Sequence, residues 1–336
     1  MNVLLWAAVA AASATLILMP IMRWAALRCG YLDVPNDRSA HAQPTPRTGG
    51  YAILLGIVSG VAVSASPFDL RVGLILLGAS MLAIAAFVDD RRVMPRIARL
   101  GIQFAVAALV IWGLLFATPH PWRDNPALLA VGTIGAVIWL VGVINAYNFM
   151  DGLNGMAGVA AAVTGTALAL MALWRGDVPA AALAIAAAAA AAAFLPFNLF
   201  NGSVFMGDSG ATALGLVFGA LVVNATRAGG VPIMEALPVM SFVLDAGTTV
   251  VRRALRGERF FATRHRSSYY QLLQQLGWSH AAVAGVYGLL TLISASVALS
   301  LGGLSTVQRT VALASLAVIH IALFTWIQTR WSRQSP

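Results

Sequence analysis

The chain alternates between long apolar segments and polar connections. Eleven apolar segments run approximately over residues 3–22, 49–66, 72–88, 100–117, 127–147, 157–174, 178–197, 211–224, 231–251, 281–301 and 310–330. A helix that crosses the hydrocarbon core needs about 20 residues, and a helix satisfies all its backbone groups within one segment. The pattern therefore predicts an all-α, polytopic transmembrane helix bundle with about 10–11 spans.

Composition supports a membrane protein. Hydrophobic residues make up 60% of the chain and charged residues only 10%, with a mean hydropathy of +0.82. Soluble domains carry about 25% charged residues, so a soluble fold is excluded. We expect residues 1–336 to form a single transmembrane domain, with the first segment retained as a helix and not cleaved as a signal peptide.

The connections are of two kinds, and their arginines predict the topology. Five short connections hold one arginine each. Five longer connections, which are rich in polar and charged residues, hold 16 arginines together with the C-terminal tail. The positive-inside rule places the rich set in the cytoplasm, the N-terminus in the periplasm and the C-terminus in the cytoplasm. The net charge of +9 then reflects topology and not a nucleic-acid partner. The rich connections, which are the expected active-site loops, span about 23–48, 89–99, 145–156, 197–211 and 252–280.

Two of these loops carry oxygen ligands. In NAYNFMDGLNG, Asn145 and Asn148 are three residues apart, as are Asn148 and Asp151, so they share a helical face. In VFMGDSG, Asp208 lies between glycines where the next helix starts, a position that favours anions. Amide and carboxylate oxygens suit magnesium. Helix capping is the structural alternative for the polar residues of both motifs. Phe205 either packs within the protein or stacks on the base of a nucleotide.

Charged clusters mark the other loops. The adjacent carboxylates of Asp89 and Asp90 repel each other unless a cation or arginines compensate; a solvated helix end is the alternative. Arginines near either end of the first loop suit a phosphate, of a lipid or of a substrate. The run Arg264, His265, Arg266 suits a diphosphate or anionic lipid. Together these groups predict metal-assisted phosphoryl chemistry on a lipid.

The alternative function is a transporter or flippase of a lipid-linked or nucleotide sugar. Transporters place their binding groups near the bilayer midplane, often between inverted repeats. Here the acidic groups lie at one predicted face and no repeat is visible. The chain also has no Walker loop and no GxGxxG motif, which disfavours an ATPase or a dinucleotide enzyme.

NAYNFMDGLNG and VFMGDSG, with the other rich loops in order over residues 30–285, resemble the polyprenyl-phosphate N-acetylhexosamine-1-phosphate transferases. Three motifs look like the branch that initiates O-antigen synthesis: DVPNDRSAHAQPTPRTGG, Asp245 followed by TTVVRRALRGE, and HRSSYYQLL followed by GWSH. Ser268 stands in place of a second histidine of that branch. The resemblance implies transfer of N-acetylhexosamine-1-phosphate from a UDP-sugar to undecaprenyl phosphate with release of UMP. It also implies that the enzyme needs Mg²⁺, which Mn²⁺ can replace. The implied location is the bacterial inner membrane, with the active site on the cytoplasmic face. A homodimer is compatible with the resemblance.

The resemblance also implies roles for individual residues. Asn148 and Asp208 match metal-ligand positions, and Asp208 is expected to be catalytic as well. Asp89 and Asp90 match a catalytic pair near the phosphate of undecaprenyl phosphate, the lipid carrier. The expected UDP-sugar-binding residues are Asn145, Asp151, Gly152, Asn154, Asn198, Phe205, Arg264, His265 and Arg266. Our hypothesis for the carrier phosphate is that Arg38, Arg47 and Arg99 bind it.

The arginine asymmetry makes the topology testable. Reporters fused after Arg333, or inserted within residues 256–265, should report the cytoplasm, because arginine-rich connections stay inside. A reporter within residues 121–125 should report the periplasm. Opposite results at two of these three sites would reject the topology.

Overall fold

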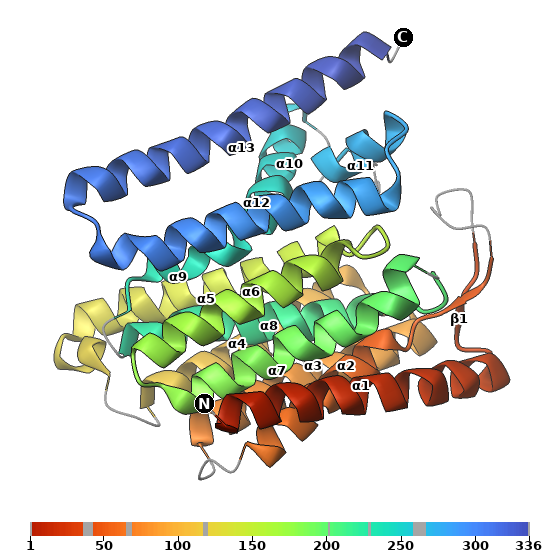
Figure 1. Ribbon diagram of the computed structural model, residues 1–336, viewed down its shortest axis with the longest axis horizontal. Helices are drawn as coiled ribbons and strands as arrows, with labels where there is room; N and C mark the ends of the chain where they lie inside the picture. Colours follow the sequence, from red (N-terminus) through yellow and green to blue (C-terminus); the bar gives the residue numbers. More distant parts are fainter. Residues whose placement is uncertain are drawn as a thin grey trace.

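The computed structural model describes residues 2–35, 43–64, 69–116, 120–200, 202–227, 230–257 and 267–334, and most of them are helical (Figure 1). The helices are α1 (Asn2–Cys29), α2 (Gly49–Val63), α3 (Leu70–Arg92), α4 (Arg96–Phe116), α5 (Pro126–Met150), α6 (Met156–Trp174), α7 (Val178–Leu195), α8 (Gly207–Arg227), α9 (Pro232–Ala236), α10 (Met240–Leu255), α11 (Tyr269–Gln275), α12 (His280–Ser300) and α13 (Thr306–Gln334). Short turns are η1 (Pro121–Asp124), the π-helical η2 (Pro196–Phe200), η3 (Leu237–Val239) and η4 (Leu301–Gly303).

The described helices confirm the predicted fold class. Ten helical stretches are long and apolar enough to cross a bilayer, and α2 is a shorter apolar helix. All eleven apolar segments of the sequence are therefore helical in the part of the chain that the structure describes. The placement of the two termini relative to the membrane stays a prediction.

Several helices extend beyond the apolar segments that predict them. The segment 72–88 belongs to α3, which continues to Arg92, and the segment 127–147 belongs to α5, which continues to Met150. Hydropathy marks the part of a helix that lies in hydrocarbon, whereas the backbone hydrogen bonds continue into the polar interface. As a result Asp89, Asp90 and Asn148 lie on regular helix and not in loops.

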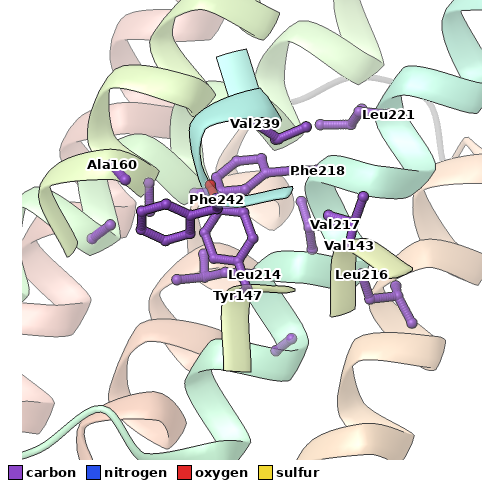
Figure 2. Packing of buried hydrophobic residues seen from close by; sticks show 14 of the residues in the cluster. Val143, Tyr147, Ala160, Leu214, Leu216, Val217, Phe218, Leu221, Val239 and Phe242 are labelled. Carbon is purple, nitrogen blue, oxygen red and sulfur yellow. The ribbon is translucent and has the colours of Figure 1, made fainter. Parts of the chain in front are cut away.

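The centre of the bundle is α8, whose residues from Ser209 to Ala225 are all buried. It packs against α2 to α7, with α5 and α3 prominent among them. Figure 2 shows the aromatic part of this packing. The centroid of the Tyr147 ring of α5 is 5.6 Å from that of Phe218 of α8 and 5.0 Å from that of Phe242 of α10. A helix that is apolar on every side is suited to a protein core or to a membrane span, and in α8 other helices and not lipid cover it.

The outer helices are less enclosed. In Figure 1, α13 runs along one edge of the molecule, where it packs on α11 and α12. At the opposite edge α1 packs on α2 and α7, and the alanines of α7 are largely buried there. Both α1 and α13 expose large apolar side chains, such as Trp6 and Val311, which suits contact with lipid.

A buried ionic network joins the ends of α3, α7 and α8 that lie away from Asp208. The Arg71 guanidinium binds the carboxylate of Asp69 at 2.6 Å and that of Asp177 at 2.8 Å, and donates to the Asn224 carbonyl at 3.1 Å. Burial raises the pKa of the Asp177 carboxyl, but Arg71 and Asn224 outweigh burial and hold it below its usual value. Removing one partner of such a buried pair typically costs roughly 3–5 kcal/mol, so the network fixes these helix ends relative to one another.

The start of α2 is joined to the start of α8 by backbone contacts. The β-hairpin of β1 (Leu32–Asp33) and β2 (Thr45–Pro46) leads into α2. The Phe205 N–H donates to the Pro46 carbonyl at 2.8 Å, and the N–H groups of Gly49 and Gly50 donate to the carbonyls of Phe205 and Met206 at 3.0 and 2.9 Å. These bonds hold the residues that precede α2 beside those that begin α8.

Gly50 leaves no room for a side chain at this junction, which we call the α2–α8 junction. A Cβ atom on Gly50 would lie 2.1 Å from the Gly210 backbone nitrogen. We expect Gly50→Ala to separate the two helix starts and to cost about 1–3 kcal/mol through overpacking. Thermal unfolding of the purified protein in detergent should show a lower melting temperature.

The matched control is Gly135→Ala, because a Cβ atom on Gly135 would meet nothing within 4 Å. It should leave the melting temperature unchanged or raise it slightly, since alanine favours a helix more than glycine does. Equal melting temperatures for the two variants would contradict the close approach of α2 and α8.

Candidate active site

Five aspartates from four segments gather where α3 ends and α8 begins. Asp33 comes from β1, Asp89 and Asp90 from the last turn of α3, Asp151 from the C-cap of α5, and Asp208 from the first turn of α8. We call these five residues the aspartate cluster. Four of them, Asp89, Asp90, Asp151 and Asp208, were predicted as site residues, and they come from three separate loops of the prediction. The fold therefore brings distant parts of the sequence to one end of the bundle.

Two arginines hold most of this cluster together. The Arg47 guanidinium lies 2.9 Å from the Asp33 carboxylate and 3.5 Å from that of Asp90. The Arg99 guanidinium lies 2.9 Å from the Asp89 carboxylate and 3.9 Å from that of Asp208. Compensation of the Asp89–Asp90 pair by arginines was one of the alternatives that the sequence left open.

The end of α3 positions the Asp89 carboxylate. Val93, at the C-cap of α3, takes a φ of 42°, which is rare for a β-branched residue. The turn lets the Met94 N–H donate to Asp89 Oδ1 at 2.6 Å, while Arg99 donates to Oδ2 at 2.9 Å. Both oxygens of Asp89 are therefore directed by specific donors.

Tyr31 holds the Asp90 carboxylate, and sequence reasoning missed this residue. Its hydroxyl donates to Asp90 Oδ2 and lies 3.4 Å from the Tyr51 hydroxyl. Burial raises the pKa of Tyr31, and its bond to Asp90 raises it further, so the hydroxyl keeps its proton. The Arg91 guanidinium covers the ring of Tyr31 at 5.6 Å. Tyrosines are common at membrane interfaces, which hides such a role in the sequence.

The carboxylates of Asp151 and Asp208 lie near enough for their charges to repel each other. Burial raises the pKa of the Asp151 carboxyl well above its usual value, and the neighbouring Asp208 carboxylate raises it further, against a hydrogen bond from the Gly207 N–H and the charge of Arg47. Asn148 lies one helical turn before Asp151, and its amide makes no hydrogen bond to any described residue. Two carboxylates that repel each other are stabilised by a cation.

The donor set fits magnesium better than a metal held by protein alone. Among the described residues, no three His, Cys, Asp or Glu side chains converge as a metal site. Magnesium typically takes one or two carboxylates and completes its coordination with water and substrate phosphates. The coupled pair of Asp151 and Asp208, with an amide one turn away, matches such a sparse set.

Two predicted UDP-sugar residues use their amides within the protein. The Asn145 amide N–H groups donate to Gln103 Oε1 on α4 at 2.7 Å and to the Val141 carbonyl at 2.8 Å. Asn198 is buried in η2. Its Oδ1 accepts from the Gly155 N–H at 2.5 Å and its Nδ2 donates to the Val204 carbonyl at 3.0 Å. Asn198 thus ties the loop after α5 to the loop before α8.

Three further predicted residues lie around these loops. A Cβ atom on Gly152 would lie 2.2 Å from the Tyr270 hydroxyl oxygen, so only glycine fits there. The Asn154 N–H donates to His280 Nδ1 at 3.4 Å. The Phe205 backbone belongs to the α2–α8 junction, and its side chain is half-buried. Their roles toward a nucleotide stay predictions.

Four predicted residues lie outside the described residues: Arg38, Arg264, His265 and Arg266. Ser268, which replaces the family histidine, is described. It is fully buried at the N-cap of α11, where its N–H donates to Gln271 Oε1 at 3.2 Å. The Ser268 side chain thus lies inside the protein, and its effect on the choice of sugar stays a prediction.

An open groove of about 520 Å³ runs along one face of α10. Its walls are apolar from Val243 to Leu255, and its arginines, Arg252 and Arg256, lie in the last turn of α10 and directly after it. Arg252 also donates to the Ser267 carbonyl, just before α11. The groove therefore combines apolar walls with cationic groups at one end of the helix.

Comparison with known proteins finds a matching family and relatives along most of the chain. The family model described as "Glycosyl transferase family 4" matches residues 72–226. A probable undecaprenyl-phosphate N-acetylglucosaminyl 1-phosphate transferase of Bacillus subtilis is 28% identical over 79% of this chain and 75% of its own. A decaprenyl-phosphate N-acetylglucosaminephosphotransferase of Mycolicibacterium smegmatis is 28% identical over 77% and 72%.

A third relative is the phospho-N-acetylmuramoyl-pentapeptide-transferase of Halalkalibacterium halodurans. It is 30% identical over 282 residues, which cover 76% of this chain and 83% of the relative. Identity at this level over most of both chains, together with the matching family model, shows common descent. The chain belongs to glycosyl transferase family 4.

Proposed function

We propose that this protein transfers N-acetylhexosamine-1-phosphate from a UDP-sugar to undecaprenyl phosphate. The names of relatives from three genera describe phosphosugar transfer, and two of these names specify a polyprenyl phosphate. The observation that carries the proposal is the aspartate cluster, which two arginines hold at one end of a membrane bundle. That arrangement suits a reaction between two phosphates, one of them on a lipid.

In the proposed reaction an oxygen of the carrier phosphate attacks the sugar-bearing phosphorus of the UDP-sugar. A new P–O bond forms, the P–O bond to the UMP moiety breaks, and UMP leaves with the bridging oxygen. The products are undecaprenyl-diphosphate-N-acetylhexosamine and UMP. A phosphomonoester has a second pKa of about 6, so the carrier phosphate is largely ionised at neutral pH and needs little help from a base.

The protein's main task is then to bring two anions together. Arg47 and Arg99 lie among the aspartates that orient them, and a guanidinium has five N–H donors, more than a single carboxylate uses. We propose that Asp89 and Asp90 orient Arg99 and Arg47, and that these arginines bind the carrier phosphate. Alignment of reactants in this way removes much of the entropic part of a barrier.

Asp208, Asn148 and the coupled Asp151 are the residues that would hold Mg²⁺ with the diphosphate. When bound, the metal neutralises charge on the diphosphate and stabilises the departing UMP. The groove along α10 is proposed to take the first part of the prenyl chain, because its walls are apolar and arginines lie near its end. The lipid product would start a surface polysaccharide such as O antigen, on the cytoplasmic face of the inner membrane.

The direct experiment is to assay purified protein with undecaprenyl phosphate and a panel of UDP-sugars. UMP release that depends on the lipid is the expected result, and the panel identifies the sugar. A transporter in detergent solution would release no UMP. Release of UDP in place of UMP would indicate transfer of the sugar alone.

The metal residues give a quantitative prediction. Asp208→Asn keeps the shape of the side chain and removes one charge. If the metal supplies several kcal/mol of transition-state stabilisation, turnover should fall roughly a thousandfold or more, since about 1.4 kcal/mol is tenfold in rate. EDTA should abolish wild-type activity, and Mg²⁺ or Mn²⁺ should restore it.

The control for this variant is Asp124→Asn, which changes an exposed aspartate of η1, far along the chain from the cluster. It should keep wild-type turnover. Full turnover by Asp208→Asn, or by wild type in excess chelator, would refute the metal assignment and reopen the transporter hypothesis.

A further inference from the structure

Asp245 is a buried carboxylate that the proposed reaction does not use. It lies in α10 with 0% exposure. Its Oδ1 accepts from the Tyr269 N–H at 3.1 Å and from the Thr249 hydroxyl at 3.2 Å, and its Oδ2 accepts from the Tyr270 N–H at 3.2 Å and from the Tyr287 hydroxyl. A buried ionisable group inside a membrane bundle is costly unless its partners satisfy it.

These contacts attach α11 to two helices of the bundle. The two N–H groups belong to the first residues of α11, and Tyr287 belongs to α12. The chain is fixed again just before α11, where the Ser267 carbonyl accepts from Arg252 of α10. Asp245 is thus the point at which α10, α11 and α12 meet.

The attached α11 in turn contacts the turn that follows α5. The buried Tyr270 hydroxyl donates to the Phe149 carbonyl at 3.0 Å and accepts from Gln271 Nε2 at 3.1 Å. Phe149 is in the last turn of α5, where carbonyl groups have no partner within the helix. The hydroxyl also lies against Gly152, whose missing side chain makes room for it.

Phe149 and Gly152 are the direct neighbours in sequence of the two residues of this turn that matter for the proposed chemistry. Asn148 precedes Phe149, and Asp151 precedes Gly152. The Tyr270 hydroxyl therefore touches the backbone on both sides of Asp151, opposite the start of α8, whose Gly207 N–H donates to the Asp151 carboxylate. A second contact to the same loop comes from His280, which accepts from the Asn154 N–H and lies 3.3 Å from Gln274 of α11.

We propose that Tyr270 is a positioning residue, which Asp245 holds in place and which fixes the turn carrying Asn148 and Asp151 relative to Asp208. This inference rests on the proposed function, because it assigns Tyr270 to the site that binds the diphosphate and Mg²⁺. The Tyr270 hydroxyl bonds to Phe149 and Gln271, whereas Arg47 and Arg99 pair with aspartates of β1 and α3. We therefore expect binding of the lipid not to depend on this hydroxyl.

The test is Tyr270→Phe, which keeps the ring and the backbone contacts to Asp245 and removes only the hydroxyl. The loss of one hydrogen bond is worth about 1 kcal/mol, close to the roughly 1.4 kcal/mol of a tenfold change. Mg²⁺-dependent binding of the UDP-sugar, measured by calorimetry, should weaken by several-fold up to about tenfold. The KM for undecaprenyl phosphate should stay unchanged, and the melting temperature should stay within a few degrees of the wild-type value.

The matched control is the neighbouring Tyr269→Phe. The Tyr269 ring stacks on Phe324 at 4.2 Å, and its hydroxyl makes no hydrogen bond to any described residue. This variant should bind UDP-sugar as wild type does. If Tyr270→Phe and Tyr269→Phe bind equally well, or if the defect of Tyr270→Phe appears only with a lower melting temperature, the positioning role is wrong.

Asp245 is tested by comparing two replacements. Asp245→Asn keeps an oxygen acceptor for α11 and should retain more Mg²⁺-dependent UDP-sugar binding than Asp245→Ala, which keeps none. Equal binding by these two variants would overturn the role of Asp245. The two hypotheses can fail separately. UMP release by the wild-type protein tests the proposed function, whereas UDP-sugar binding by the tyrosine variants tests the positioning role.

Discussion

The complete burial of α8 is the constraint on which the rest of the structure depends. Because Ser209–Ala225 are enclosed by neighbouring helices, polar groups at both ends of α8 need partners within the protein. At one end Asn224 joins the network of Arg71 and Asp177. At the other end the α2–α8 junction closes so tightly that Gly50 and Gly210 touch. The site is built on the helix whose position is most strictly fixed.

The ion pairs of the site contribute little to stability, which separates their role from that of the Arg71 network. The Arg47 side chain is 40% exposed, and Asp208 is 44% exposed. Pairs this accessible are worth about 0–1 kcal/mol, whereas the side chains of Arg71 and Asp177 are only 8% and 4% exposed. The fold therefore gathers the aspartates through its helices and backbone junction. In the proposed reaction these exposed arginines would exchange a carboxylate for an incoming phosphate.

The sequence predicts the fold better than it predicts contacts. Apolar segments became helices because a lipid-facing helix needs a continuous apolar surface, which hydropathy measures directly. Asp89, Asp90, Asp151 and Asp208 were recognisable because carboxylates at a membrane boundary are costly without a task. The sequence left open that nearby arginines compensate Asp89 and Asp90, as Arg99 does for Asp89. The pairing of Arg47 with Asp33 and Asp90 was not recognisable, since a pair distant in the chain leaves no periodic signal.

The residues that sequence reasoning missed have ordinary local patterns. Tyr31, Gln103 and Tyr270 are tyrosine and glutamine side chains near helix ends, and only their partners, Asp90, Asn145 and the Phe149 carbonyl, reveal a role. Asn198 was assigned to the substrate, whereas both ends of its amide join two loops. Packing decides such roles, and packing depends on the whole fold.

The central claim is that a phosphate group moves together with the sugar, and its most direct test follows that phosphorus atom. UDP-N-acetylglucosamine labelled with ³²P at the sugar-bearing phosphate, or the corresponding label in whichever UDP-sugar is active, is incubated with purified protein and undecaprenyl phosphate. The account predicts that the label enters the organic-soluble lipid while unlabelled UMP appears in equal amount. Label that stays in the aqueous nucleotide fraction while sugar enters the lipid, or no transfer with any UDP-sugar, would contradict it.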